Sequence, residues 1–181
     1  MLRHLTSIAV MSVLLCSGAS GAEYDAVGVV RFSNLQGFLS NLEDVPLIAK
    51  QFSEFNGVAL QTGSIRPNSV PETVFEDNEI EIIQFEGVQG PNPYFGNREL
   101  QIIIGRGGQI HCTWVAEFTI VIDKATALAV FSGDGQFTVV GGTGRYENAT
   151  GSLQTCFESE PTPLTADSAI ATYTQVGTIN P

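Results

Sequence analysis

One glycine-rich stretch, residues 131–151, constrains the fold of this chain more than any other segment. Apolar and polar residues alternate along it, and its glycines gather at Gly133–Gly135 and at Gly141–Gly144. Glycine reaches positive φ without steric cost, so glycine clusters between alternating runs are typical of turns and bulges in antiparallel sheets. The stretch predicts a strand, a tight turn at 133–135, a short strand over 136–140, a glycine corner and a further strand from about Ala149.

The segment Gln109–Asp123 is the longest strand candidate. Apolar side chains occupy one face, and His, Thr, Val and Glu alternate with them on the other. Alternation with period two over this length indicates a strand with one apolar and one mixed face, as in the wall of a barrel. The apolar face would consist of Ile110, Cys112, Trp114, Ala116, Phe118, Ile120 and Ile122.

Shorter β-rich runs, separated by glycine and proline loops, occupy most of the chain from Tyr24–Phe32 to Ser168–Gly177. The interruption is residues 38–52, where apolar residues fall near helical spacing around Pro46, so a short helical or irregular segment is expected there. No change of composition divides the chain into two domains. The pattern predicts one all-β domain over residues 23–181, a closed antiparallel β-barrel of about eight strands.

The second glycine cluster belongs to a longer motif that resembles the signature of the allene oxide cyclase and dirigent-protein barrel family: Phe137-x-Val139-x-Gly141-Gly142-Thr143-Gly144-Arg145-Tyr146-x-x-Ala149-x-Gly151. This resemblance implies a barrel with an apolar pocket, assembled as a homo-trimer. The family includes a cyclase that converts a reactive epoxide and dirigent proteins that steer phenoxy-radical coupling. We expect the motif residues, Arg145 and Tyr146 included, to shape the glycine corner and not to catalyse.

Residues 1–22 are typical of a secretory signal peptide. Arg3 precedes an apolar run, Ile8–Leu15, which is too short to span a bilayer, and cleavage is expected after Ala22 or alternatively Ala19. The sequence thus predicts a secreted protein, extracellular or, in a Gram-negative host, periplasmic, with no membrane span. Loss of Arg3 takes the formal net charge from −11 to −12, and such an acidic chain argues against nucleic-acid partners.

Two cysteines remain after cleavage, Cys112 and Cys156. In an exported domain an isolated pair is more typical of a disulfide than of reactive thiols, and this one would contribute at most about 4 kcal/mol. His111 directly precedes Cys112, and neighbours in a strand point to opposite faces, so no metal site is expected. No cofactor is expected either, because Glu147 stands where a dinucleotide fingerprint needs its third glycine.

A barrel of this size is either filled by side chains or leaves room for one small ligand. Trp114, Phe118, Phe137 and Tyr173 are the candidate ligand-binding residues, although the same side chains could simply pack the core. Glu117, in the middle of the longest strand, is the first candidate for a general acid or base, because an apolar interior would raise its pKa. The competing interpretation points Glu117 outward into solvent.

Three functions remain open. The first, which the family resemblance favours, is a secreted barrel that binds a small apolar molecule and steers its conformation or stereochemistry. The second is an isomerase or cyclase that uses a buried polar residue such as Glu117, and the third is a filled barrel that serves as an extracellular structural or interaction module. Separately, Asn148 opens an N-glycosylation sequon in an expected surface loop.

Overall fold

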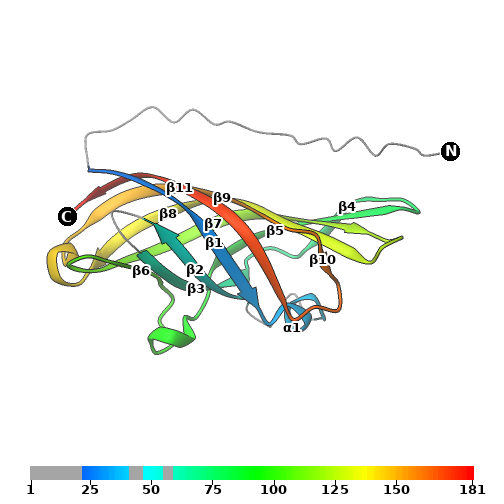
Figure 1. Cartoon of the computed structure of the whole chain (residues 1–181), viewed down its shortest axis with the longest axis horizontal. Helices are drawn as coiled ribbons and strands as arrows, with labels where there is room; N and C mark the ends of the chain where they lie inside the picture. Colours follow the sequence, from blue (N-terminus) through cyan, green and yellow to red (C-terminus); the bar gives the residue numbers. More distant parts are fainter. Residues whose placement is uncertain (1–21, 41–46, 55–58) are drawn as a thin grey trace.

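The computed structural model of the chain describes residues 22–40, 47–54 and 59–181, so the expected signal peptide, apart from Ala22, lies outside the described part. In these ranges the helical elements are one α-helix, α1 (Leu35–Ser40), and two 3-10 turns, η1 (Pro93–Phe95) and η2 (Gly144–Tyr146). All other regular structure in the described residues is strand (Figure 1). The strands are β1 (Ala22–Ser33), β2 (Leu47–Glu54), β3 (Ala59–Pro67), β4 (Glu72–Glu76), β5 (Ile80–Gln89), β6 (Gln101–Gly105), β7 (Gly108–Asp123), β8 (Leu128–Gly142), β9 (Thr150–Ser159), β10 (Thr162–Pro163) and β11 (Ser168–Asn180).

All strands belong to one sheet of 11 strands, in the order β10-β8-β9-β11-β1-β2-β3-β6-β7-β5-β4. Two further pairings join β8 to β7 and β3 to β5, and every pairing is antiparallel. Figure 1 shows β1, β11, β9, β8 and β7 as neighbouring, strongly twisted ribbons. The prediction of an all-β antiparallel fold is confirmed.

The predicted long strand is present as β7, and its two faces differ as expected. Side chains from Ile110 to Ile120 alternate between buried and exposed or half-buried positions. At one end of the sheet α1 covers the interior, because Leu35 and Phe38 are both buried and the Phe38 ring lies 5.8 Å from that of Phe85. The buried faces of the strands and this short helix therefore share one hydrophobic core.

The predicted turn at Gly133–Gly135 is wrong, because β8 runs through these residues without interruption. Asp134 lies opposite Glu117 of β7 on one side and Cys156 of β9 on the other, so the segment is paired along both edges. Neither glycine has positive φ. Glycine is needed at both positions because of the limited space and not because of its backbone freedom. A Cβ on Gly133 would lie 2.5 Å from the Phe157 ring, and a Cβ on Gly135 would lie 2.6 Å from the Cβ of Ala116.

The prediction of one helical or irregular segment over residues 38–52 is wrong for its second half. The helix α1 ends at Ser40, residues 41–46 lie outside the described part, and β2 begins at Leu47. The backbone of β2 pairs with β1 on one side and with β3 on the other. Two neighbouring strands supply hydrogen bonds along the whole segment, and this tertiary context overrides the near-helical spacing of the apolar residues.

The glycine corner is where the motif predicts it. Gly141 and Gly144 have φ values of 126° and 61°, conformations that favour glycine. A Cβ on Gly142 would lie 2.0 Å from the carbonyl oxygen of Gln109, so the chain needs a glycine there for close approach. Tyr146 is buried beneath the corner, and the Arg145 guanidinium lies 4.6 Å from the centre of its ring and donates a hydrogen bond to its hydroxyl.

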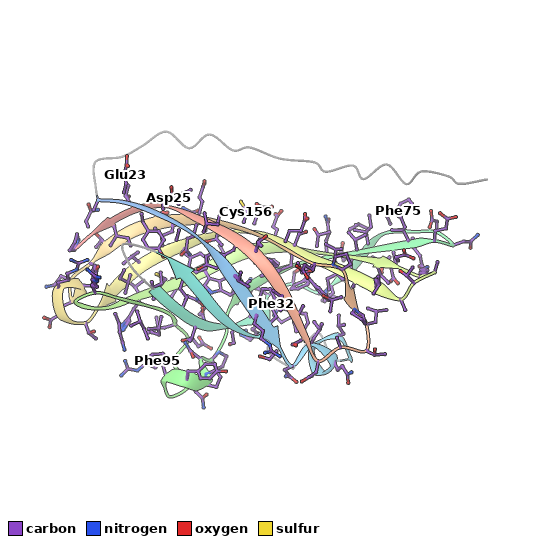
Figure 2. The ribbon with its side chains drawn as sticks, viewed as in Figure 1. Glu23, Asp25, Phe32, Phe75, Phe95 and Cys156 are labelled. Carbon is purple, nitrogen blue, oxygen red and sulfur yellow. The ribbon has the colours of Figure 1, made fainter. Side chains whose placement is uncertain are left out.

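The predicted disulfide between Cys112 and Cys156 is wrong, because the two side chains occupy opposite faces of the sheet. Cys112 is fully buried and lies opposite Val139 of β8, whereas Cys156 is exposed and lies opposite Asp134 of the same strand. In Figure 2 Cys156 projects on the same outer side as Glu23 and Asp25. A disulfide needs close Cβ atoms, and residues facing opposite sides of a sheet cannot provide them.

Candidate functional site

The candidate site is an internal cavity whose base is built from three rows of side chains across β7, β8 and β9. The register of these strands defines the rows: Trp114–Phe137–Leu153, Ala116–Gly135–Thr155 and Phe118–Gly133–Phe157. The middle row holds only small side chains, and large aromatic ones lie on both sides of it. A hollow is left in the middle because nothing in this row is long enough to fill it.

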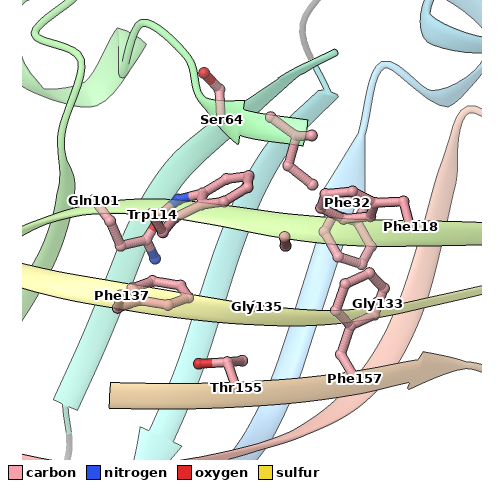
Figure 3. A pocket seen from close by; sticks show the side chains of 12 residues that line it. Phe32, Ser64, Gln101, Trp114, Phe118, Gly133, Gly135, Phe137, Thr155 and Phe157 are labelled. Carbon is pink, nitrogen blue, oxygen red and sulfur yellow. The ribbon is translucent and has the colours of Figure 1, made fainter. Parts of the chain in front are cut away.

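The cavity has a volume of ≈40 Å³. One water needs roughly 10–15 Å³ measured in this way, whereas pockets for drug-sized molecules start at about 300 Å³. The space therefore exceeds that of a single water but suits only a small molecule, unless the surrounding rings move. Its walls are Phe32, Ser64, Ile65, Gln101, Trp114, Ala116, Phe118, Gly133, Gly135, Phe137, Thr155 and Phe157 (Figure 3).

Five aromatic rings form a connected chain around the cavity. Trp114 is stacked against Phe137 with centroids 5.9 Å apart, and it meets Phe118 at 6.0 Å in a tilted arrangement. Phe157 then links Phe118, at 5.7 Å, to Phe32, at 5.1 Å. These separations lie within the range of favourable aromatic pairs, about 4.5–7 Å, so the rings support one another's positions and keep the hollow open.

The cavity has a polar end and an apolar end. Figure 3 shows the rings of Phe32, Phe118 and Phe157 together at one end, and the Trp114 nitrogen turned toward Gln101 at the other. Trp114 is only 9% exposed, yet its Nε1 has no hydrogen-bond partner among the described residues. A buried indole N–H normally finds an acceptor. This atom is thus the most unusual polar group of the site.

Behind the polar end lies a network of buried amides and hydroxyls. Gln61 is fully buried and its Nε2 donates to Oε1 of Gln175 at 2.7 Å and to the Tyr24 hydroxyl at 3.1 Å. Gln175 in turn donates to Oγ1 of Thr155 at 2.9 Å, and Gln101 donates to Oε1 of Gln61 at 3.4 Å. The network fixes Gln101 and Thr155, the two polar side chains that turn toward this end of the cavity.

The four predicted ligand-binding residues are all buried, but they do not form one group. Trp114, Phe118 and Phe137 line the cavity, as the alternation of their strands indicates. Tyr173 does not line it, because its hydroxyl faces the polar network, where it accepts a hydrogen bond from Gln61 at 3.5 Å. Sequence reasoning missed two further cavity residues, Phe32 of β1 and Phe157 of β9. No local sequence pattern reveals the register of these strands with β7 and β8.

Glu117 does not enter the cavity. Its side chain is exposed, and it lies in a row with Glu86 of β5 and Asp134 of β8 on the outer face. The competing interpretation of Glu117 as a solvated outward residue is therefore the correct one, and its assignment as a buried general acid or base is wrong.

The remaining predicted positions lie away from the cavity. Asn148 is exposed in the turn that follows η2, which agrees with a surface sequon. His111 is half-buried beside Gln109, whose Oε1 lies 3.1 Å from its Nε2, and desolvation together with the nearby charge of Arg98 lowers its pKa. Within the described ranges, no three His, Cys, Asp or Glu side chains gather where they could hold a metal ion.

Comparisons with known proteins give little. No family model and no curated protein matches the chain. Among solved structures, a likeness was found to Ail, the attachment invasion locus protein of Yersinia pestis, with 11% sequence identity over 88% of this chain and 97% of that one. Its TM-score is 0.17, and a likeness this weak carries no argument. In the described part of the chain, no helix has the length and apolar character to cross a membrane.

Proposed function

We propose that this protein is a secreted or periplasmic barrel that binds a small apolar molecule in its interior and holds it in one conformation. The observation that carries the proposal is the cavity, which has five aromatic walls and no charged side chain among the described residues that line it. Holding a flexible reactant in one productive geometry can by itself direct the outcome of a reaction that starts elsewhere. This is the role that the resemblance to dirigent proteins implies.

The proposal includes a closed barrel of eight strands. In its support, the hydrogen-bonded neighbours run β7-β8-β9-β11-β1-β2-β3-β6 and return to β7. The strands β4, β5 and β10 are then additions, of which β5 bridges β3 and β7. An eight-stranded barrel has an interior just wide enough to be filled or to hold one small ligand, which agrees with a hollow caused by one row of small side chains.

An isomerase or cyclase is the second candidate, and the cavity gives it less support. General acid–base catalysis needs a group that exchanges a proton within hydrogen-bond reach of the reactant. The polar lining residues are Ser64, Gln101 and Thr155, none of which titrates near neutral pH. An enzyme built on this site would act through orientation and hydrogen bonding, and Glu117 would take no part.

Uptake of small apolar molecules tests the proposal directly. Native mass spectrometry of the purified chain, with a panel of one-ring phenolic and hydrocarbon compounds, should show one ligand bound per chain. Ala116→Leu should abolish uptake, because the larger side chain occupies the hollow. Val115→Leu is the matched control: Val115 is the neighbouring residue on the same strand, but it is 43% exposed on the outer face, so uptake should not change.

The same spectra decide between the candidates. If the wild-type chain takes up none of the compounds, the cavity is not a binding site, and the filled structural or interaction module becomes the better interpretation. If Ala116→Leu binds as well as the wild type does, the ligand sits elsewhere. The spectra also report whether the chain forms the homo-trimer that the family resemblance implies. Circular dichroism of both variants shows whether they fold.

A further inference from the structure

Four apolar side chains form a row on the outer face of the sheet, on the side away from the cavity. Phe75 of β4 pairs with Ile82 of β5, which pairs with Val121 of β7. Val121 in turn pairs with Val130 of β8. Phe75 is 48% exposed and the other three are half-buried. In Figure 2 Phe75 projects on the same side as Cys156. We call these four residues the apolar row.

The next two rows on the same outer face of β5, β7 and β8 are polar. They are Gln84–Thr119–Ser132 and Glu86–Glu117–Asp134. A sheet face turned to water usually carries such side chains. Cross-strand packing within the apolar row stabilises the sheet, but it leaves much of the Phe75 ring in water, together with Ile80 at 38% exposure. This part of the face can therefore bury further apolar surface against a partner.

The charges around the apolar row are almost all negative. Residues 72–81 contain five acidic residues and no basic one: Glu72, Glu76, Asp77, Glu79 and Glu81. Lys124, in the turn between β7 and β8, is held by this group, because its Nζ donates to Oε1 of Glu76 at 2.7 Å and to the carbonyl oxygen of Asp77 at 2.8 Å. A second copy docked through the same face would bring its carboxylates against these ones, and phosphate groups would be repelled. The complementary partner is basic.

The spacing within the apolar row suits an amphipathic helix. Neighbouring strands lie about 4.7–4.9 Å apart, so the row from β4 to β8 spans roughly 14 Å. On one face of a helix an apolar residue recurs about once per turn, or about every 5.4 Å. A helix of about three turns laid across the strands therefore brings one apolar side chain to each member of the row.

We propose that the apolar row is a docking surface for a basic amphipathic helix of a partner protein. The apolar side chains of the helix pack against Phe75, Ile82, Val121 and Val130. Its lysine and arginine side chains extend from the edges of this contact to the surrounding carboxylates. The interaction does not depend on the cavity, because the row lies on the other face of the sheet.

A model peptide tests the proposal on the purified chain. The probe is a helical peptide of about four turns, built from leucine and lysine with all leucines on one face. Isothermal titration should show one peptide bound per chain, with weaker binding at higher ionic strength. A scrambled peptide of the same composition keeps the charge but has no apolar face, so it should bind much more weakly. The ordered peptide with glutamate in place of lysine should not bind.

Phe75→Thr/Val121→Thr locates the surface. Threonine suits an exposed strand position, so the fold should persist, whereas the loss of two apolar contacts should weaken peptide binding about tenfold or more. Val115→Thr is the matched control, because Val115 is 43% exposed on the outer face of β7 but pairs with Gln136, outside the row. Circular dichroism checks the fold. If the double variant does not fold, Val121→Thr replaces it, and the comparison of ordered and scrambled peptides on the wild type still decides.

Four outcomes would overturn the proposal. Equal binding of the ordered and scrambled peptides would show a general attraction to an acidic chain. Undiminished binding to Phe75→Thr/Val121→Thr would place the helix elsewhere. A wild-type oligomer that these two substitutions make monomeric would show that a second copy occupies the row. No binding at up to millimolar peptide would leave the row with cross-strand packing as its only role. Small-molecule uptake by the double variant should equal that of the wild type, so the proposed function is tested separately.

Discussion

Cys112 and Cys156 show how the face on which a residue lies decides its chemistry. Burial raises the pKa of the Cys112 thiol to about 12 from its ordinary value of 9.0, so almost no thiolate forms at neutral pH. Cys156 is exposed on the outer face. Since the thiolate is the reactive form, the two residues should differ strongly in reactivity although neither is part of the cavity.

Thiol labelling checks this difference. In a chain that begins at Ala22, a disulfide reagent at pH 8 should modify Cys156 quickly and Cys112 only after unfolding. Cys156→Ser should remove the fast reaction, and Cys112→Ser should leave it intact. Because the unfolded thiol ionises above pH 9 while the folded one stays protonated, stability should fall as the pH rises from about 9 to about 12. Rapid modification of both residues at pH 8 would contradict the buried position of Cys112.

At the scale of elements, β8 is the strand on which the site depends. It pairs with β7 along one edge and with β9 along the other, and its Gly133 and Gly135 leave the space that the Phe157 ring and the Ala116 side chain occupy. Glycine usually weakens a strand interior, because it loses more conformational entropy on folding and packs no side chain. The glycines of β8 are retained where neighbouring side chains need their space.

Gly135→Ala tests this role of β8. The new Cβ would lie 2.6 Å from the Cβ of Ala116 and 3.0 Å from the carbonyl oxygen of Val115, so the core must shift, and we expect a loss of about 1–3 kcal/mol of unfolding free energy. Gly105→Ala is the matched control, because its nearest neighbour is the Tyr146 hydroxyl at 3.8 Å. Urea unfolding of both variants measures the difference. Equal stabilities would mean that Gly135 lies in a relaxed turn and not in a packed strand.

At the scale of the whole molecule, long-range pairings tie the sheet together. β1 is hydrogen-bonded to β11, near the other end of the chain, and β8 joins β7 and β9. The packed side chains of these strands share one core. We expect a sheet held together in this way to unfold as one cooperative unit.

Two optical probes check cooperativity. Fluorescence of Trp114, the single tryptophan, follows the cavity on β7, whereas far-ultraviolet circular dichroism follows the whole sheet. We expect both signals to change with the same midpoint in urea. A fluorescence transition at clearly lower urea would show that the aromatic cavity opens before the sheet, and the proposed single unit would be wrong.

The sequence by itself determined that the fold is all-β, where its longest strand lies and which face of that strand is apolar. These properties are local: the alternation along Gln109–Asp123 follows from the period of two in an extended chain, and the glycine corner follows from the backbone freedom of Gly141 and Gly144. Trp114, Phe118 and Phe137 were predicted to face inward for this reason, and they do.

Only the tertiary structure decided the site. The hollow exists because Ala116, Gly135 and Thr155, from three different strands, fall in one row. The register between two strands cannot be read from the sequence of either strand alone. For the same reason Gly133–Gly135 resembled a turn, since a glycine that provides space for Phe157 and Ala116 cannot be told from one that bends the backbone. Register also placed Glu86, Glu117 and Asp134 side by side on the outer face of the sheet, which no single strand could reveal.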